Sequence, residues 1–404
     1  MRMLKALVLV VPLALAAGCS GGAGSSSSDP AGAGIVIGAT LSLTGSLDGL
    51  GSPLEAGYKQ EIADVNAAGG IAIDGTKEKL RLVVLDNGSN PETAATQAST
   101  LVQQDHAVAL LGYATTQIVT PVALIAEQLH VPFLTSLMPV EAFANGDKTG
   151  WTYSWDLFYD EQRQAVDTAK ALASVPSNKK VALFTDSEPD SVVEGALYKA
   201  AFTAAGLDVV GDYTFAAGTT GFSSYIADAK AAGAQLVAGQ LAAADGAALW
   251  TQLKSSGLNP KAAYLAASDA DGWSQSLGSL AEDTLSGGYW SSSQASPGQL
   301  ASIAGTLGKK YADSQDYATA ALGYAVAEVL TDALAKAGSA NPGKINTAIS
   351  KTDAQTAAGL ITFNQYTHTA TTPYYITQWQ DGELVQVQPR ASGVTLDVPT
   401  AGLG

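Results

Sequence analysis

Short apolar segments alternate with helical segments along most of the chain, and this alternation limits the possible folds more than any other feature. The first apolar segment, Ile35–Leu41, is bounded by turn residues and is typical of a buried strand. Helical spacing of apolar residues follows over 54–67. Strands that alternate with helices of about 10–15 residues indicate parallel sheets covered by helices on both faces.

The strand–helix order runs to residue 134 and begins again after Tyr153, so we expect two similar α/β lobes. Ligand contacts in such lobes come from the turns at the carboxyl ends of the strands. Further strands are expected at 79–86, 108–112, 131–134, 180–185, 208–213, 235–238 and 262–265. Helices are expected at 90–104, 117–129, 161–173, 191–205, 222–232, 245–256, 299–311, 318–337 and 344–350.

The last part of the chain has two distinct patterns. In the alanine-rich helix 318–337, Glu328, Asp332 and Lys336 recur every four residues and give it one polar stripe, so we expect a packing helix and not a membrane span. Residues 360–389 alternate aromatic and polar side chains, which favours antiparallel strands. The pair Asp381-Gly382 is a hairpin turn signal within them.

The N-terminus has the pattern of a secretory signal. Arg2 and Lys5 precede an apolar run of about 12 residues, which is too short to span ~30 Å of hydrocarbon at 1.5 Å per residue. The small residues before Cys19 resemble the lipobox of bacterial lipoproteins, although Ala16 stands where leucine is commonest. That resemblance implies a signal peptide at 1–18 and a diacylated Cys19. A plain signal cut near Ala17, which would leave a free thiol, is the alternative.

Residues 20–34 are rich in Gly, Ser and Ala and have no apolar face, so we predict a flexible tether over 19–34. Two or more acyl chains on Cys19 would hold such a protein stably on a lipid bilayer.

Composition excludes several classes of function. The chain has 37 acids, 21 bases and a net charge of −16, without the Lys/Arg cluster that a nucleic-acid binder needs. A single cysteine excludes disulfides within the chain and Cys-based zinc sites. The three histidines are far apart in sequence, so we expect no metal and no cofactor.

Sequence motifs of catalysis are missing from the part of the chain that folds. The one GxSxG match, residues 18–22, falls in the signal and tether, and no HExxH or GxxxxGK[ST] motif occurs. Acids are plentiful, so a hidden carboxylate pair stays open. We expect a protein that is not an enzyme.

Several short motifs occur in an order that resembles the solute-binding proteins of branched-chain amino-acid ABC transporters, the leucine/isoleucine/valine-binding family. Each motif is weak alone, and their shared order and spacing carry the resemblance. They are Ile35-Val36-Ile37-Gly38, Leu43-Thr44-Gly45, Ile62 to Ile71, Leu85-Asp86-Asn87, Asn90-Pro91, Val131-Pro132-Phe133, Gly206 to Val210 and Phe363-Asn364.

This resemblance implies the periplasmic binding fold of type I. That fold has two doubly wound parallel-sheet α/β lobes joined by three crossovers, expected near Phe158, Leu285 and Thr356. Lobe 1 would then comprise 35–158 and 285–355, and lobe 2 would comprise 159–284 and 356–390, followed by a C-terminal tail at 391–404. A small ligand would bind between lobes that hinge shut around it.

Two loops of lobe 1 match the family's carboxylate-binding loops. Tyr113, Thr115 and Thr116 precede the helix expected at Gln117, and the free amides of a helix N-terminus suit a carboxylate. The alternative for these threonines is ordinary helix capping. Ser136 and Leu137 follow the strand at 131–134, where the alternative is a plain connection.

In lobe 2 the resemblance points to acids for a ligand ammonium. Asp245 aligns with an acid that binds the ammonium in family members, and Asp160 matches another site acid. An N-cap that faces water is the alternative for both.

Two positions depart from the family pattern. Asp190 stands where many members carry a tyrosine that touches the ligand, and Leu50 stands where some have an aromatic residue at the cleft mouth. The added acid favours a more polar or cationic ligand than leucine, isoleucine or valine. For the aromatic residues we expect core packing and not a stacking platform; they are Trp151, Tyr153, Trp155, Trp273 and Trp290.

From the sequence we therefore expect an extracytoplasmic, membrane-anchored receptor that is a monomer. It would capture an amino acid or a similar small molecule and deliver it to the membrane subunits of an ABC permease. One alternative is a sensory module on the same fold that reports its ligand to a partner protein. A secreted α/β enzyme is the other.

Overall fold

The computed structural model describes residues 34–266, 268–269, 272–311, 315–389 and 395–398. The expected signal peptide, Cys19 and the tether up to residue 33 lie outside the described residues. Of the expected tail at 391–404, only 395–398 are described, and there the Asp397 amide donates a hydrogen bond to the Gln378 side chain (2.8 Å).

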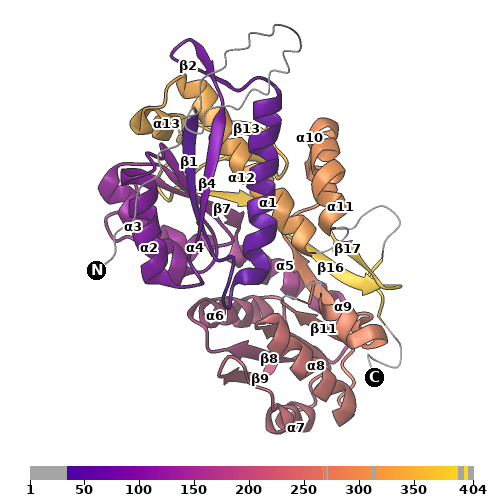
Figure 1. Ribbon diagram of the computed structural model, residues 1–404. Coiled ribbons are helices and arrows are strands. Elements are labelled where there is room, and N and C mark those ends of the chain that lie inside the picture. Colours follow the sequence, from indigo (N-terminus) through magenta and orange to yellow (C-terminus); the bar gives the residue numbers. More distant parts are fainter. Residues whose placement is uncertain (1–33, 267, 270–271, 312–314, 390–394, 399–404) are drawn as a thin grey trace, which may run out of the picture. The chain divides into compact units, whose positions relative to one another are not determined.

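Two sheets organise the described residues (Figure 1). The first has six parallel strands in the order β15-β7-β6-β5-β1-β4. These strands are β1 (Ile35–Leu41), β4 (Leu80–Asp86), β5 (Ala109–Leu111), β6 (Phe133–Ser136), β7 (Ser154–Tyr159) and β15 (Thr369–Thr372). We call the unit built on this sheet lobe 1.

The second sheet has the order β17-β16-β12-β11-β10-β8-β9, and we call its unit lobe 2. Strands β8 to β12 are parallel, and β16 and β17 add an antiparallel edge. The strands are β8 (Lys180–Asp186), β9 (Asp208–Phe215), β10 (Leu236–Gln240), β11 (Ala262–Leu265), β12 (Leu285–Gly288), β16 (Tyr375–Gln380) and β17 (Glu383–Gln388).

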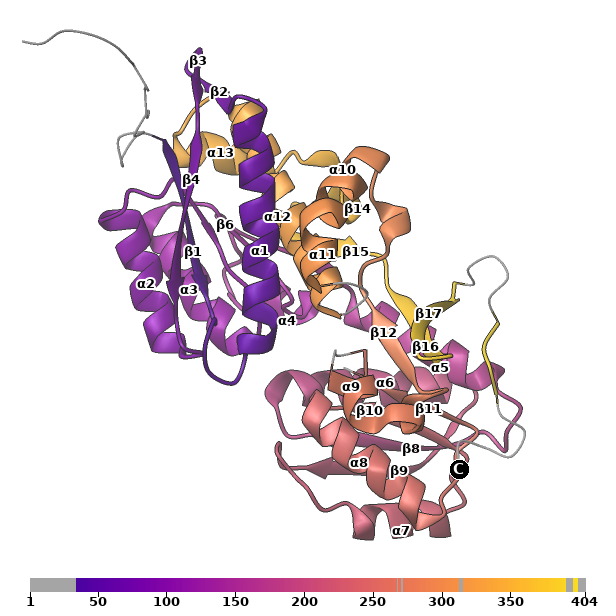
Figure 2. The same ribbon diagram turned by 45° about the vertical axis from the view of Figure 1, so that its right-hand side comes forward.

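Helices cover both faces of the lobe 1 sheet. On one face, α1 (Asp48–Ala67) and α12 (Gln315–Ala337) lie side by side, as Figures 1 and 2 show. On the other face lie α2 (Pro91–Gln103) and α3 (Thr116–Leu129). Alternate residues of β1 enter two separate cores, since Ile37 packs on the α1/α12 side and Val36 on the α2/α3 side.

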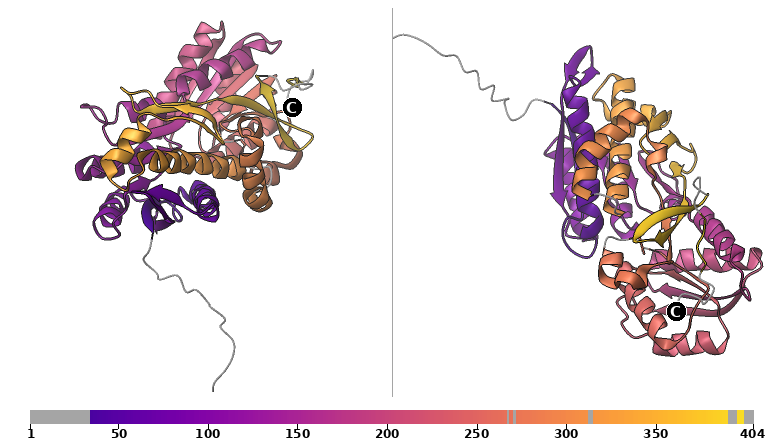
Figure 3. Two further views of the ribbon diagram at one scale, coloured as in Figure 1. Left: turned by 90° about the horizontal axis from the view of Figure 1, so that it is seen from above. Right: turned by 90° about the vertical axis from the view of Figure 1, so that its right-hand side faces the viewer.

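Lobe 2 repeats this layering around its own two cores. The helices α5 (Glu161–Ser174) and α6 (Pro189–Ala204) pack on one face of its sheet, and α7 (Ser223–Ala231) and α8 (Ala243–Ser256) on the other. The two views of Figure 3 show these helices around the strands from above and from the side. The expected fold class, two doubly wound α/β lobes, is confirmed.

The chain passes between the two sheets three times, and two of the expected crossover points are wrong. The first crossover follows β7, close to the expected Phe158. The return to lobe 1 was expected near Leu285, which is too early, because β12 (Leu285–Gly288) still pairs with β11 and β16 of lobe 2. Crossing near Thr356 is also too early, because Thr369 of β15 pairs with Asp156 of β7 in lobe 1. Residues 285–288 therefore belong to the lobe 2 sheet, and 369–372 belong to the lobe 1 sheet.

Several local expectations have clear outcomes. The helix expected at 299–311 is interrupted, and it consists of α10 (Pro297–Ser302), a π-helical turn (Ile303–Leu307) and α11 (Gly308–Tyr311). The Asp381-Gly382 turn is confirmed, with both residues at positive φ as a tight hairpin turn requires. The antiparallel strands expected over 360–389 are confirmed for β14 (Gly359–Thr362), which pairs with β13 (Asp353–Thr356), and for β16 and β17. For β15 the expectation is wrong, because this strand is parallel to β7. Elements that the sequence did not predict include β2 (Ile71–Ile73), β3 (Thr76–Glu78), α4 (Val140–Ala144), α9 (Gly272–Leu277), β12 and β13.

One described helix, Asp316–Ala337, is long and apolar enough to cross a membrane by length and composition, and 78% of its most apolar window is buried inside the protein. This helix packs against α1 and also contacts α13 (Pro342–Ile349). The expectation of a packing helix agrees with this burial.

Candidate functional site

Most of the predicted ligand residues lie at or just after the carboxyl ends of parallel strands, where ligands bind in open α/β sheets. In lobe 1, the residues from Tyr113 to Thr116 follow β5, and Ser136 is the last residue of β6. Asp160 follows β7, and Asp190 and Asp245 lie in the first turns of α6 and α8, after β8 and β10. The backbone joins the two lobe 1 loops directly, because the Ala114 amide donates a hydrogen bond to the Ser136 carbonyl (3.2 Å).

Both lobe 1 loops hold a non-glycine residue in the left-handed region. Ala114 has φ +89° and Leu137 has φ +58°. Such backbone costs about 1–3 kcal/mol per residue and tends to occur at ligand sites, where the surrounding structure enforces it. Ser136, between them in space, is fully buried beside the Tyr58 hydroxyl.

Tyr113 has a supporting position under the site. It is 1% exposed, and its hydroxyl lies 2.9 Å from the Ser42 carbonyl oxygen and 2.8 Å from that of Leu47. Burial is the largest cause that raises the pKa of Tyr113. The hydroxyl therefore stays protonated and donates hydrogen bonds to these carbonyls. Leu50, in the first turn of α1, is half-buried and packs against the same core. These contacts fix the β1–α1 loop.

Thr116 and Asp190 are brought together from different lobes. The Thr116 hydroxyl donates a hydrogen bond to one Asp190 oxygen (2.8 Å), and the Thr116 amide donates to the other (3.3 Å). Thr116 opens α3, so the carboxylate lies at a helix N-terminus, where the macrodipole favours negative charge. The side chain of Thr115, the N-cap residue, makes no capping hydrogen bond. The amide and hydroxyl of Thr116, predicted to bind a ligand carboxylate, hold a carboxylate of lobe 2 in this structure, and their contact with a ligand stays a prediction.

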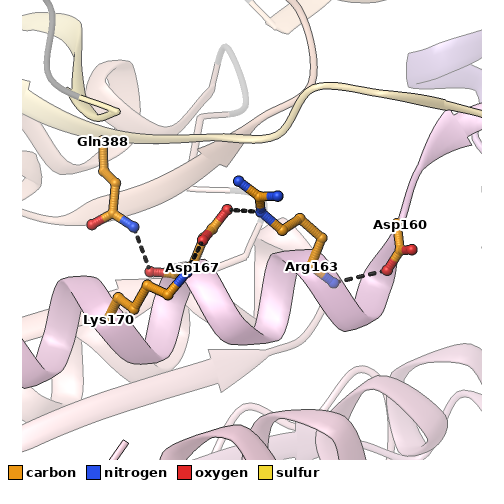
Figure 4. A network of polar contacts seen from close by, with 5 residues as sticks. All are labelled: Asp160, Arg163, Asp167, Lys170 and Gln388. Atoms are coloured by element: carbon orange, nitrogen blue, oxygen red, sulfur yellow. Dashed lines mark hydrogen bonds and ion pairs between the residues drawn. The ribbon is translucent and has the colours of Figure 1, made fainter.

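Asp160 and Asp245 have partners within lobe 2. The Asp160 carboxylate accepts a hydrogen bond from the Arg163 amide (2.8 Å) and caps α5, as Figure 4 shows. Further along α5 in the same view, Asp167 binds Arg163 and Lys170. Asp245 lies in the first turn of α8, is 3% exposed, and accepts a hydrogen bond from the Gly218 amide (2.9 Å). A ligand contact of either acid stays a prediction.

The sequence did not single out three buried acids near the first crossover. Asp156 lies on β7, Glu161 opens α5 and Glu194 lies on α6, and they are 0%, 2% and 5% exposed. Burial is the main cause that raises the pKa of each, and the charge of Glu161 adds to it for the other two. Glu194 lies one helical turn after Asp190 in α6, and this spacing is the sequence signal that could have placed Glu194 near Asp190.

One cavity, with a volume of about 870 Å³, is lined by residues of both lobes and by none of the predicted ligand residues. From lobe 1 it takes Trp290 and Tyr317, whose rings meet edge to face with centroids 5.3 Å apart. From lobe 2 it takes Asp269, in the loop after β11, and Trp379. The expected core packing is confirmed for the buried Trp151, Trp155 and Trp273. Trp290 packs against the lobe 1 core and also lines this cavity.

Comparisons with known proteins agree with this architecture. Residues 34–383 match the family described as "Periplasmic binding protein". The chain belongs to the periplasmic binding protein family. Leu/Ile/Val-binding protein homolog 3 of Brucella melitensis is 24% identical over 363 residues, which are 88% of this chain and 94% of that protein.

Two further relatives carry amino-acid names. An "Amino acid binding protein" of Pseudomonas aeruginosa is 25% identical over 203 residues, a match that spans 50% of this chain and about half (52%) of that protein. The crystal structure of the branched-chain amino acid transporter substrate binding protein LivJ from Streptococcus pneumoniae in complex with isoleucine has a TM-score of 0.73 at 21% identity. The match covers 87% of this chain and 99% of the Streptococcus pneumoniae chain, and the likeness is to the periplasmic binding fold of type I.

Proposed function

We propose that the protein is an extracytoplasmic solute-binding lipoprotein of an ABC importer. It captures an amino acid or a related small molecule between its lobes and delivers it to the permease. The observation that supports this best is the carboxylate of Asp190 at the N-terminus of α3, held by the amide and hydroxyl of Thr116. Donors that hold this carboxylate can hold the carboxylate of a ligand in the same way.

The work of such a receptor is differential affinity for two arrangements of the lobes, with no bond made or broken. A ligand that contacts Thr115, Thr116 and Ser136 on one side and residues of lobe 2 on the other binds the closed arrangement more tightly. Ligand binding therefore draws the lobes together, and the permease receives the closed form.

A thermal-shift screen over the common amino acids, short amides and small carboxylic acids tests the proposal. A ligand at ~100 times its Kd should stabilise the protein by ~2.7 kcal/mol and should be recovered chemically unchanged. Conversion of the ligand would indicate an enzyme instead. If no amino acid, amide or small carboxylic acid shifted the melting temperature, the proposal would fail.

Thr116→Val tests the carboxylate site itself. The change removes the hydroxyl and keeps the side-chain shape, so we expect affinity for the hit to fall by about tenfold, the equivalent of ~1.4 kcal/mol. Thr96→Val is the matched control in the same lobe, since its exposed hydroxyl bonds only the Glu92 carbonyl of its own helix (2.9 Å). Equal affinities for both variants would remove Thr116 from the site.

Membrane anchoring through acylated Cys19 is the second part of the proposal. Cys19→Ala should release the protein from the membrane fraction and leave the affinity of its binding domain unchanged. Mass spectrometry of the native protein should find acyl chains on Cys19. A native N-terminus at another residue, with an unmodified thiol, would contradict the anchor.

A further inference from the structure

A small cavity lies between α4 of lobe 1 and helices α5 and α6 of lobe 2. Its polar lining consists of four carboxylates, those of Glu141, Glu161, Asp190 and Glu194, and no basic residue lines it. Apolar atoms of Val193 and Leu197 complete the wall. The cavity has a volume of about 10 Å³, which is about the space that one water molecule or one primary ammonium group needs.

Two of these acids are buried and lack a partner for one oxygen. Glu161 is 2% exposed; its Oε2 accepts a hydrogen bond from the Glu141 amide (3.3 Å), and its Oε1 has no hydrogen-bond partner. Glu194 is 5% exposed, and its Oε2 has no partner either. The ion pairs among the described residues all lie elsewhere, so neither carboxylate has a fixed cation.

The charges around this cavity reinforce one another. Burial is the largest cause that raises the pKa of Glu161 to about 7, and the charges of Glu141 and Asp160 add to it. For Glu194, burial and then the charges of Glu161, Asp190 and Asp186 hold the pKa well above its usual range. An unpaired buried charge costs several kcal/mol, so near neutral pH the cavity favours either protons or a cation.

We propose that this cavity binds the primary ammonium group at the end of a ligand's alkyl chain, which makes the protein selective for cationic ligands. The inference rests on the proposed function and names the class of solute. An ammonium group has three donors, and the cavity offers the unpartnered Glu161 Oε1 and Glu194 Oε2, with Asp190 as a third carboxylate in its lining. The apolar wall at Val193 and Leu197 suits the methylene groups that carry it.

Asp190 links this cavity to the carboxylate site. It lines the cavity and also accepts hydrogen bonds from Thr116. When a ligand carboxylate displaces the Asp190 carboxylate from Thr116, Asp190 can accept a hydrogen bond from the ligand ammonium in the cavity.

The size of the cavity excludes other cations. A planar guanidinium or a quaternary ammonium is too large for a space of about 10 Å³. A metal ion suits it less well, because the described residues hold no group of three or more acidic, His or Cys side chains arranged for one.

The test compares L-lysine with L-norleucine, which has the same chain without the terminal ammonium, by calorimetry on the purified chain at pH 7.5. We expect lysine to bind at least tenfold more tightly than norleucine, and arginine to bind more weakly than lysine. Equal or tighter binding of norleucine would overturn the inference and leave the proposed function intact. If neither amino acid bound and no compound of the thermal-shift screen stabilised the protein, both the inference and the proposed function would be overturned.

Glu194→Gln should abolish the preference for lysine, because it removes one charge and keeps the volume of the side chain. Glu328→Gln is the matched control, since Glu328 is also an acid with a pKa raised by burial to about 7, and both of its oxygens have partners, Gln299 and Ala357. It should keep the preference. A preference that survives Glu194→Gln, or stabilisation by KCl or CaCl₂ equal to that by lysine, would overturn the inference.

Discussion

At the scale of single residues, Asp245 holds the loop between β9 and α7. Its buried carboxylate accepts a hydrogen bond from the Gly218 amide at 2.9 Å. Truncation of the side chain leaves that amide without its acceptor, so we predict that Asp245→Ala lowers the free energy of unfolding by about 1–3 kcal/mol. Urea denaturation measures this loss of stability.

Asp228→Ala is a suitable control for that variant, because Asp228 is exposed on α7 of the same lobe and its loss should change stability by less than about 0.5 kcal/mol. The opposite pattern, with full stability and weakened binding of an amine ligand, would assign Asp245 to the ligand ammonium as the family resemblance implies.

The sequence predicted where the site residues lie better than what they touch. Thr116 and Ser136 could be placed because Thr116 follows β5 and Ser136 lies at the end of β6, and both strands are recognisable in the sequence. Whether Asp160 caps a helix or faces a ligand could not be decided, because the same residue at the same position serves both purposes. Glu161 and Glu194 were missed, since an acid inside a helical segment normally faces water and only the packing of α5 on α6 buries them.

At the scale of elements, α1 and α12 pack so closely that glycines are needed at their contact. A Cβ on Gly57 of α1 would lie 2.1 Å from the Ala320 carbonyl oxygen of α12. Backbone cannot move aside as a flexible side chain can, so we predict that Gly57→Ala costs at least about 1–3 kcal/mol. The midpoint of urea denaturation should fall accordingly.

Gly49→Ala, in the same helix, separates this packing effect from helix propensity. No atom lies within 4 Å of a Cβ at Gly49, and alanine is the better helix former. Its stability should therefore be equal to the parent or up to about 1 kcal/mol higher. A loss at Gly49 as large as that at Gly57 would show that close approach of the two helices is not the cause.

Element types were predictable where a pattern is long, and their pairing was not. The periodicity over 318–337 predicted the long helix that the structure places at Gln315–Ala337. The short strand Thr369–Thr372 carries no signal for the sheet that it joins, and its pairing with β7 was missed for that reason. Turn chemistry at Asp381-Gly382 acts locally, so the β16–β17 hairpin could be read from two residues.

At the scale of the whole molecule, three acids of the described residues combine burial with the lack of an ion pair. Glu61 and Glu328 in lobe 1 and Glu161 in lobe 2 each have a pKa raised by burial from 4.5 to about 7. The buried carboxyl of Glu61 accepts a hydrogen bond from the Thr331 hydroxyl (2.6 Å). Proton uptake by the folded protein is therefore spread over both lobes.

These shifts set the direction in which stability changes with pH. Between pH 4.5 and 7 the folded protein retains protons that the unfolded chain has released, so the free energy of unfolding falls as pH rises through that window. Each unit of pKa difference corresponds to about 1.4 kcal/mol. Asp86 acts in the opposite sense, because backbone hydrogen bonds, first that of Gly88, lower its pKa. Its contribution to the free energy of unfolding is present above the usual pKa of a carboxyl and is lost as the pH falls below it.

We therefore predict a lower urea midpoint at pH 7.5 than at pH 5 in the absence of ligand. Glu328→Gln should flatten this fall, because the amide does not titrate, whereas Glu92→Gln on the exposed face of α2 should leave its slope unchanged. Stability that rises steadily from pH 5 to pH 7.5 would mean that these carboxyls are ionised in the folded protein. In that case fixed cations, and not protons, would have to balance the acids of both lobes.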